Sequence, residues 1–198
     1  MIYLLFIDLR QMSRRINIIS TAAILFRNKG YAATTMRDIA RELSIEAASL
    51  YNHIPSKQKI LSELLMDVAQ LFTEGMAQVL VSQVSALDKL KKLIALHVQL
   101  TIKHTDAIAL IPTEWVHLDE PNLKEFVLLR DRYEKEFRTL MQAAADKGDL
   151  NIVDVDLAVF TLLSTLRWLY SWYSKYQPVD PKALEQELTR YLIKGVGS

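Results

Sequence analysis

The sequence predicts an all-α protein of about nine helices, with a three-helix head joined by one long helix to a larger helical body. Three observations support this fold class. The 198 residues include only 5 Gly and 5 Pro, which leaves few places to turn a hairpin. Apolar residues recur at helical spacing, and cap residues separate the apolar runs. Hydrophobic residues make up 51% of the chain, enough for a packed core.

The head is predicted to contain three short helices. Gly30 fits the position just after the first of them, and Thr35 with Asp38 forms a capping-box pattern at the start of the second. Pro55 ends the third, because the residue before a proline disfavours the helical conformation. The three helices are expected at residues 14–29, 36–43 and 47–53.

Small and apolar residues indicate how these helices pack. Ala40 is small enough to let the third helix cross the second closely, and Ile45 is expected to hold the turn at residues 44–46 against the core. Leu50 is expected to face inward on the third helix. The inner face of the first helix is predicted to consist of Ile16, Ile19, Ala22, Ala23 and Phe26.

The body is predicted to be helical throughout, without a flexible linker to the head. Ser56 caps the long connecting helix, Pro121 fits the first turn of a later helix, and Asp154 or Asp156 caps a strongly apolar one. The expected body helices cover residues 57–81, 87–104, 107–118, 121–147, 157–175 and 181–194.

Charge is divided unevenly along the chain, although the net charge is only +1. Residues 10–60 include nine basic and three acidic residues, a formal charge of +6, whereas residues 61–198 carry a formal charge of −4. A basic head on an acidic body favours an anionic partner for the head alone.

The second and third helices of the head have the spacing of a helix-turn-helix. A helix that enters the major groove of DNA, roughly 12 Å wide, needs small or polar side chains on its outer face. Tyr51 and Lys57 flank the third helix and are expected to hold phosphates, which set the register on DNA. The residues expected on its outer face are Ala47, Ala48, Ser49, Asn52 and His53.

Residues 18–64 resemble the DNA-binding domain of the TetR family of bacterial regulators. The resemblance is carried by Ala22-Ala23, Leu25-Phe26, Gly30, Thr34-Thr35, Ile39-Ala40, Leu50-Tyr51 and Ser56-Lys57. It implies an all-helical homodimer whose head reads a palindromic operator and whose body binds a small ligand. The DNA-contacting residues expected on this basis are Thr35, Arg37, Ala47, Ser49, Tyr51, Asn52, His53 and Lys57.

Two residues of the turn depart from the usual family pattern. Ser44 stands where the family usually has Gly, and Glu46 stands where it usually has Ser or Thr to cap the third helix. Glu is a poorer cap than Asp. Its negative charge near DNA phosphates is also expected to weaken binding.

The domain boundaries are predicted at residues 12–58 for the head and 59–198 for the body. Residues 1–11 are interpreted as a non-native or accessory extension, because Met12 precedes Ser-Arg-Arg, a common start for a DNA-binding domain. The apolar run at residues 2–7 is shorter than a signal-peptide core or a membrane span. The absence of Cys excludes disulfides and thiolate metal sites and is compatible with a cytoplasmic location.

The body resembles, less specifically, a subgroup of TetR ligand domains in which some members respond to acyl-coenzyme A thioesters. The resemblance is carried by residues 130–134, Phe137, Gly148, Asp156, Trp168 and Trp172-Tyr173. The candidate pocket residues are His97, Leu100, His104, Trp115, Phe126, Arg130, Phe160 and Arg167.

Several of these candidates also have a purely structural interpretation. Trp115 and Phe126 could be plain core residues. Arg130 and Arg167 could hold a carboxylate or phosphate of the ligand, or they could pair with an acid of the body such as Glu134.

The helix at residues 157–175 is apolar nearly all round, so it must be buried on more than one face. One face is expected to serve the monomer core and another a partner subunit, in a four-helix bundle with the last helix, as the family resemblance implies. The predicted dimer contacts are Leu162, Leu166, Leu169, Trp172, Leu188 and Leu192.

The sequence favours a ligand-responsive transcriptional regulator, most simply a repressor, over an enzyme. It has no G-x-S-x-G elbow, phosphate loop or H-E-x-x-H motif. His97 and His104 lie about 10.5 Å apart along a helix axis, which is too far to share a metal ion, so no metal site is expected. No cofactor is expected either. The alternative is a DNA-binding protein without an effector. No membrane association is expected.

Overall fold

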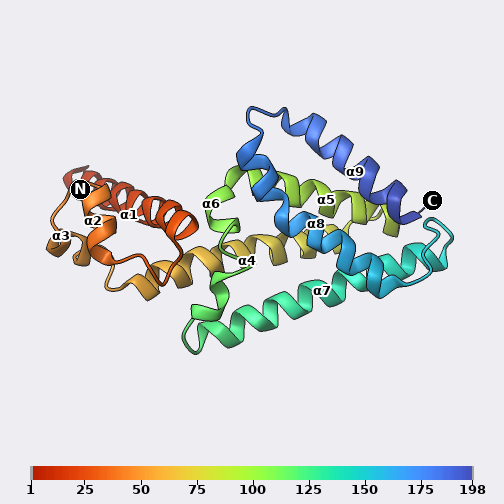
Figure 1. The fold of residues 1–198 in the computed structure, drawn as a ribbon, viewed down its shortest axis with the longest axis horizontal. Helices are drawn as coiled ribbons and strands as arrows, with labels where there is room; N and C mark the ends of the chain where they lie inside the picture. Colours follow the sequence, from red (N-terminus) through yellow and green to blue (C-terminus); the bar gives the residue numbers. More distant parts are fainter. Residues whose placement is uncertain (1, 198) are drawn as a thin grey trace.

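The computed structural model describes the backbone of residues 2–197 and the side chains of residues 12–195. In this part of the chain every regular element is helical, which confirms the all-α prediction (Figure 1). The head contains α1 (Ile2–Lys29), α2 (Met36–Glu42) and α3 (Ala47–Tyr51), and α4 (Lys57–Val81) leads into the body. The body adds α5 (Ala86–Lys103), α6 (Thr105–Ile108), the 3-10 helix η1 (Glu114–His117), α7 (Asn122–Asp146), α8 (Val155–Lys175) and α9 (Pro181–Gly197).

The head and the body lie at opposite ends of an elongated molecule, and α4 runs from one into the other (Figure 1). By length and composition alone α4 could cross a membrane. In the folded chain it packs on α1 of the head and on α5, α6 and α7 of the body, so it connects the two parts. Within the body, α5 contacts α7, α8 and α9.

Side-chain caps account for three of the predicted helix starts. The Thr35 hydroxyl accepts from the Asp38 backbone N–H at 3.1 Å, and the Asp38 carboxylate accepts from the Thr35 N–H at 2.9 Å, which completes the capping box of α2. Ser56 caps α4 and Asp154 caps α8 in the same way, each accepting from an N–H three residues on. These three predicted caps are therefore confirmed.

The segment after α5 differs from the helix predicted at residues 107–118. The chain forms only one turn of helix in α6 and another in η1. Pro112 lies between them, and a proline removes a backbone donor and disfavours helix at the preceding residue. The first helix begins at Ile2, so the predicted extension is helical from that residue on, while Met1 and the side chains of residues 1–11 lie outside the described residues.

Two predicted core positions in the head are wrong. Ile16 is 59% exposed and Ile45 is 38% exposed. Ile18 and Ile54 are buried in the head core instead. On α1 the buried face passes through Ile18, Ala22 and Phe26, and residue 16 lies about 200° around the helix from residue 18.

Ser44 has the left-handed backbone conformation that the α2–α3 turn requires, with a φ of 54°. The Ser44 N–H donates to Arg41 O and the Ile45 N–H donates to Ala40 O, both at 3.0 Å, as in a helix C-terminus closed by a left-handed residue. Glycine adopts this conformation without a Cβ penalty, which explains why the family usually has Gly here.

We therefore expect Ser44→Gly to raise the free energy of unfolding by about 0.5–1 kcal/mol, because relief of left-handed strain outweighs the added flexibility of the unfolded chain. Urea denaturation followed by circular dichroism measures this change. The matched control is Ser20→Gly in the exposed middle of α1, which should lower stability by a similar amount. A less stable Ser44→Gly variant would contradict the interpretation.

Candidate functional site

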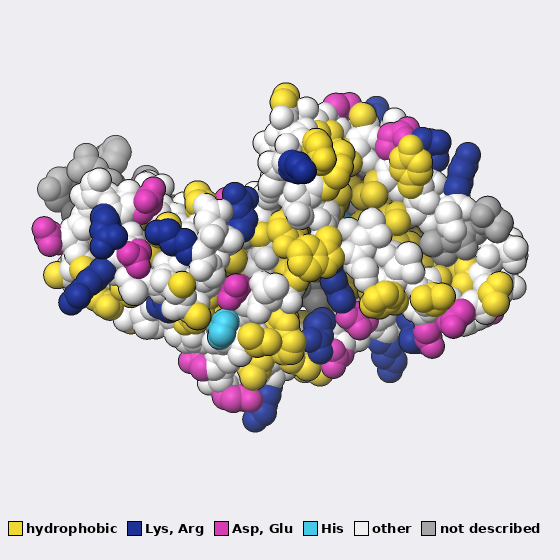
Figure 2. Space-filling model, viewed as in Figure 1, with side chains coloured by type: hydrophobic (Ala, Val, Ile, Leu, Met, Phe, Trp, Pro, Cys, Tyr) yellow, Lys and Arg dark blue, Asp and Glu magenta, His cyan; other side chains and the backbone are white. Residues whose placement is uncertain are grey.

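The candidate DNA-reading surface is the outer side of α3 and the residues that follow it. Tyr51 is 52% exposed, and Asn52, at the C-cap of α3, is exposed as well. Ser49 and His53 are half-buried. The head in Figure 2 carries several Lys and Arg side chains on its surface. These positions leave Ser49, Tyr51, Asn52 and His53 as candidates for contact with DNA.

Ala47 and Thr35 serve the structure of the head itself. Ala47 is partly buried and packs against the head core, so its side chain is less exposed than predicted. Thr35 caps α2, and its hydroxyl donates to Asp38 Oδ2 at 2.6 Å. These hydrogen bonds lower the pKa of the Asp38 carboxyl because they stabilise its charged form. Arg37 is exposed on α2 and stays a candidate phosphate contact.

Lys57 holds the loop between α1 and α2. Its ammonium donates to the carbonyl oxygens of Tyr31 and Thr34, each at 2.8 Å, and lies 4.1 Å from the centroid of the Tyr31 ring. Partial burial lowers the pKa of Lys57 because it disfavours the charged form. Two of its three donors are therefore committed inside the head, and one is left for a phosphate.

Glu46 occupies the N-cap position of α3 without acting as a cap. Its backbone is extended, with φ −68° and ψ 138°, but its side chain accepts no backbone hydrogen bond from the helix. The first N–H groups of α3 therefore lack the partner that Ser or Thr would supply. The exposed carboxylate adds negative charge at the start of the helix proposed to face DNA.

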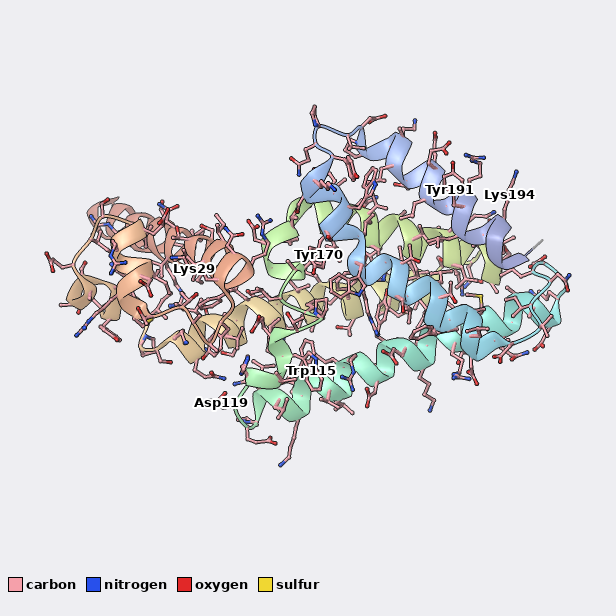
Figure 3. All side chains as sticks on the ribbon, viewed as in Figure 1. Lys29, Trp115, Asp119, Tyr170, Tyr191 and Lys194 are labelled. Carbon is pink, nitrogen blue, oxygen red and sulfur yellow. The ribbon has the colours of Figure 1, made fainter. Side chains whose placement is uncertain are left out.

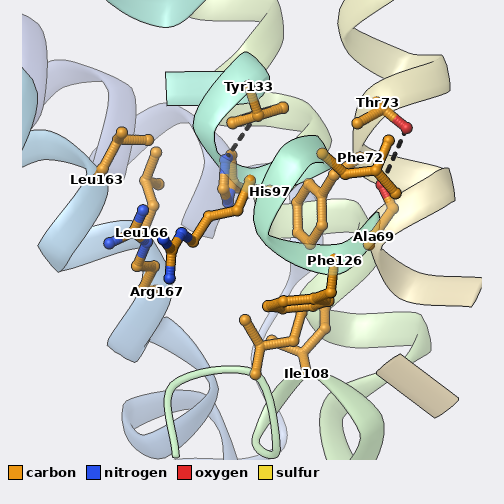
Figure 4. Close-up of a pocket in the computed structure, with 13 residues that line it drawn as sticks. Ala69, Phe72, Thr73, His97, Ile108, Phe126, Tyr133, Leu163, Leu166 and Arg167 are labelled. Carbon is orange, nitrogen blue, oxygen red and sulfur yellow. Dashed lines mark hydrogen bonds between the residues drawn. The ribbon is translucent and has the colours of Figure 1, made fainter. Parts of the chain in front are cut away.

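The body contains a cavity lined by α4, α5, α7 and α8, with α6 and the residues that follow it at one side (Figure 4). It holds about 660 Å³ of space not filled by protein atoms, its open mouth included. Four predicted pocket residues line it, namely His97, Phe126, Arg130 and Arg167. Sequence reasoning missed Phe72 on α4 and Leu163 on α8, and it assigned Tyr133 only to a family pattern and Leu166 to the dimer.

The other four predicted pocket residues lie elsewhere. Phe160 is 69% exposed and sits about 10.5 Å along α8 from Arg167, beyond the cavity. His104 lines a separate cleft between the head and the body, and Leu100 packs in a small core cluster beside the cavity. Trp115 packs behind Phe126. Among the described side chains, no three His, Asp or Glu residues lie together as a metal site would require.

The inner wall of the cavity is uncharged. His97 Nε2 and Tyr133 Oη are 2.9 Å apart, the contact drawn dashed between them in Figure 4, and the Phe72 ring lies 4.6 Å from the His97 ring. Burial, together with the nearby charge of Arg167, lowers the pKa of His97 to about 3. Burial also raises the pKa of Tyr133. Both groups are therefore neutral at physiological pH.

Two arginines bring positive charge to the edge of the cavity. Arg167 pairs with Glu134 of α7, and its side chain is 39% exposed. Arg130 is 35% exposed, pairs with Asp131 at 2.9 Å and lies 4.9 Å from the centroid of the Trp115 ring. The predicted pairing with Glu134 is thus realised for Arg167, whereas Arg130 pairs with its neighbour on α7. Their exposure places them at the mouth of the cavity.

The η1 segment connects the cavity wall to the head. Trp115 stacks on Phe126 with ring centroids 6.3 Å apart, and Figure 3 shows Trp115 beside the first turns of α7. Two residues on, the His117 carbonyl accepts from Gln58 Nε2 at 2.9 Å, and the Tyr31 hydroxyl donates to Gln58 Oε1 at 2.6 Å. A displacement of Phe126 therefore has a packed route to the loop between α1 and α2.

Most of the residues predicted to form the dimer belong to the monomer core. Leu162, Leu166 and Leu169 on α8 are at most 5% exposed, and Leu192 on α9 is also buried. Leu188 is partly buried against the core. The predicted leucine contacts on α8 were wrong because this helix is apolar on nearly every face. Its sequence therefore does not reveal which face packs against the core of its own subunit.

The outer face of α8 carries a different apolar set. Its exposed members, all between 45% and 69% exposed, are Leu157, Phe160, Trp168 and the predicted Trp172. Tyr191 is 63% exposed on α9, and hydrophobic side chains are visible over α8 in Figure 2. We name these five residues the outer apolar face.

Comparisons with known proteins agree with this architecture. Residues 18–64 match the family model described as "Bacterial regulatory proteins, tetR family", and residues 83–196 match that described as "Tetracyclin repressor-like, C-terminal domain". The chain is 28% identical over 188 residues to the HTH-type transcriptional repressor KstR2 of Mycolicibacterium smegmatis, covering 93% of this chain and 91% of that protein.

Two solved structures share the fold. The ketosteroid transcriptional regulator KstR2 of Mycobacterium tuberculosis superposes with a TM-score of 0.83 at 24% identity, covering 93% of this chain and 95% of that one. AibR in complex with isovaleryl coenzyme A and operator DNA superposes with a TM-score of 0.75 at 22% identity, covering 91% of this chain and 98% of that one.

The position of Glu46 generates a prediction about DNA affinity. Glu46→Ser should tighten DNA binding by roughly threefold to tenfold, because it removes a negative charge and supplies an N-cap. Fluorescence anisotropy at fixed salt measures this, on a duplex selected by the wild-type protein from random DNA. Glu46→Gln removes only the charge and separates the two causes. Unchanged or weaker binding by the Ser variant would count against this placement of Glu46.

Proposed function

Because the chain belongs to the TetR family of bacterial transcriptional regulators, we propose that it is a repressor released from a palindromic operator by a small hydrophobic or acyl-coenzyme A effector. As a member of this family it is a DNA-binding regulator and not an enzyme. Residues 12–58 would read the operator, and residues 59–198 would bind the effector and the partner subunit. Such a regulator would act on DNA in the cytoplasm.

The observation that carries the effector proposal is the division of the cavity into a neutral interior and a cationic mouth. Phe72 and Leu163 supply apolar wall, and His97 and Tyr133 are neutral, so the interior disfavours a charged group. The chemistry of such an interior suits an acyl chain.

The two arginines at the mouth complement the other end of an acyl thioester. Arg130 and Arg167 would meet the phosphates of coenzyme A through charge-assisted hydrogen bonds. Binding would require these arginines to exchange their pairing with Asp131 and Glu134 for the ligand. The coenzyme A thioester bound to AibR, which shares the fold, supports this class of effector.

Release from DNA would follow from the contacts between the cavity and the head. Phe126 lines the cavity and stacks on Trp115, and the η1 segment hydrogen-bonds Gln58 at the start of α4. An effector that binds one arrangement of these groups better would shift the two heads of a dimer away from successive major grooves, about 34 Å apart. The repressor function of the relative KstR2 supports repression as the default state.

We propose that a second copy of the chain covers the outer apolar face. Monomeric soluble proteins rarely leave several large apolar side chains exposed together. Trp168 and Trp172 lie on the same face of α8, and Tyr191 is likewise exposed on α9. This arrangement keeps the predicted bundle of α8 and α9 but replaces the predicted leucines with aromatic contacts.

The effector proposal predicts that medium-chain acyl-coenzyme A thioesters release the selected duplex, whereas free coenzyme A at the same concentration does not. Ala69→Leu extends a side chain from α4 into the cavity. It should raise the thioester concentration for half-release about tenfold, since one misfitted group costs on the order of 1–2 kcal/mol. Anisotropy titrations of the bound duplex measure this.

The matched control is Ala95→Leu, which makes the same change on α5 outside the cavity. It should respond to thioesters like the wild type. Failure of all thioesters to release DNA or to raise the melting temperature would instead support a regulator without an acyl-coenzyme A effector.

The dimer proposal predicts that Trp168→Glu lowers the mass in solution to that of one chain, 22.7 kDa, because a buried charge would oppose association. Light scattering at micromolar concentration measures the mass. Val116→Glu replaces another exposed apolar residue, on η1 and outside α8 and α9, and should leave the dimer intact. A monomeric wild-type protein would reject the proposal.

A further inference from the structure

Arg15 joins three elements of the head at one guanidinium. It projects from α1, and its Nη1 donates to the carbonyl oxygen of His53 at 2.9 Å, just beyond the end of α3. Its Nη2 pairs with Glu63 Oε1 on α4. Lys59 lies 3.4 Å from the same carboxylate oxygen. One planar cation therefore ties the end of the reading helix to the connecting helix.

The contact is partly shielded from solvent. The Glu63 side chain is 18% exposed and the Arg15 side chain is 37% exposed. A guanidinium presents its donors in a rigid fork, so it fixes the relative positions of its two acceptors better than a flexible ammonium would. The geometry thus constrains both the distance and the angle between His53 and Glu63.

The reading helix depends on such outside contacts because it is short. α3 has only five residues, too few for an isolated helix to be stable in water. Leu50 buries its inner side in the head core, and Ile54, after the helix, is buried there as well. Arg15 holds the carbonyl of His53, two residues beyond the last residue of α3, and so fixes the chain where it leaves the helix.

We propose that Arg15 is a positioning residue that sets the orientation of α3 for base reading, with Glu63 as its anchor. This inference rests on the proposed role of α3 in reading DNA. The neighbouring Arg14 is exposed and forms no ion pair with a described side chain, so its guanidinium is free to meet a phosphate and serves as the comparison. Net charge alone would treat the two arginines alike.

The anchor also links DNA reading to the effector-binding part of the molecule. Glu63 lies on α4, and two turns further along the same helix Ala69 and Phe72 line the cavity. A shift of α4 would move Glu63 and, through Arg15, the end of α3.

The test compares Arg15→Ala, Arg15→Lys, Glu63→Gln and Arg14→Ala. Affinities are measured for the selected duplex and for a scrambled duplex over a series of salt concentrations. Arg14→Ala should weaken both duplexes alike and lower the slope of log affinity against log salt by about 1, as loss of one phosphate contact does. Arg15→Ala should weaken the selected duplex about tenfold while the scrambled duplex changes little, because base contacts carry sequence preference.

Glu63→Gln separates the positioning role from a pure charge effect most clearly. Removal of an acid from the head should tighten binding to any DNA if charge alone matters, whereas loss of the anchor should weaken the selected duplex about tenfold. Arg15→Lys keeps the charge and loses the fork, so it should share part of this loss. If Arg15→Ala fails to fold, as its circular dichroism would show, the Lys and Gln variants carry the test.

Failure of the proposed function and failure of the positioning role give different results. If the wild-type protein selects no duplex from random DNA, the proposed function itself is wrong. If it selects a duplex but Glu63→Gln binds that duplex more tightly, or Arg15→Ala weakens both duplexes equally, the positioning role is overturned.

Discussion

The packing of body residues into the core of the head is the constraint on which the rest of the structure depends. Leu110, Leu118 and Phe126 are buried in the same cluster as Ile18 and Phe26 of α1. The head therefore does not close its own hydrophobic core, and α4 and the segment between α6 and α7 complete it. Because well-packed interiors transmit displacement rather than absorb it, the head and the cavity of the body are mechanically joined. Phe126 makes this direct, since it belongs to the head core and also lines the cavity.

A second consequence concerns the positive charge of the head. The chain carries a formal charge of +6 over residues 10–60, but much of it is used internally. Arg15 pairs with Glu63, Arg27 pairs with Asp106 of α6 at 2.6 Å, and two donors of Lys57 hold backbone carbonyls. The cations in these ion pairs hold helices in place as much as they attract DNA. A count of basic residues thus identifies the polyanion-binding end of the molecule, while the geometry decides which cations can meet phosphates.

Individual helices show which features were predictable from the sequence and which were not. The capping box at Thr35 and the cap at Ser56 were predictable because they depend on residues three positions apart. The helix predicted after α5 was wrong because apolar spacing outweighed the local signal of Pro112. On α8 the apolar spacing identified a helix whose inner face lies in the core, yet it assigned Leu162 and Leu166 to a partner and Phe160 to the pocket. Rotation about a helix axis is set by long-range packing, which periodicity alone does not specify when every face is apolar.

The sequence by itself determined the all-α class, most helix boundaries, the helix-turn-helix and the family. These follow from backbone hydrogen bonds and caps that act over a few residues. Only the tertiary structure decided that Ala47 packs against the head core, that His97 and Tyr133 form a neutral pair, and that the Arg15 guanidinium bonds to the His53 carbonyl. The contact of His97 with Tyr133 joins residues 36 positions apart in the chain, and that of Arg15 with His53 joins residues 38 positions apart. Such partners become defined only when the helices have packed.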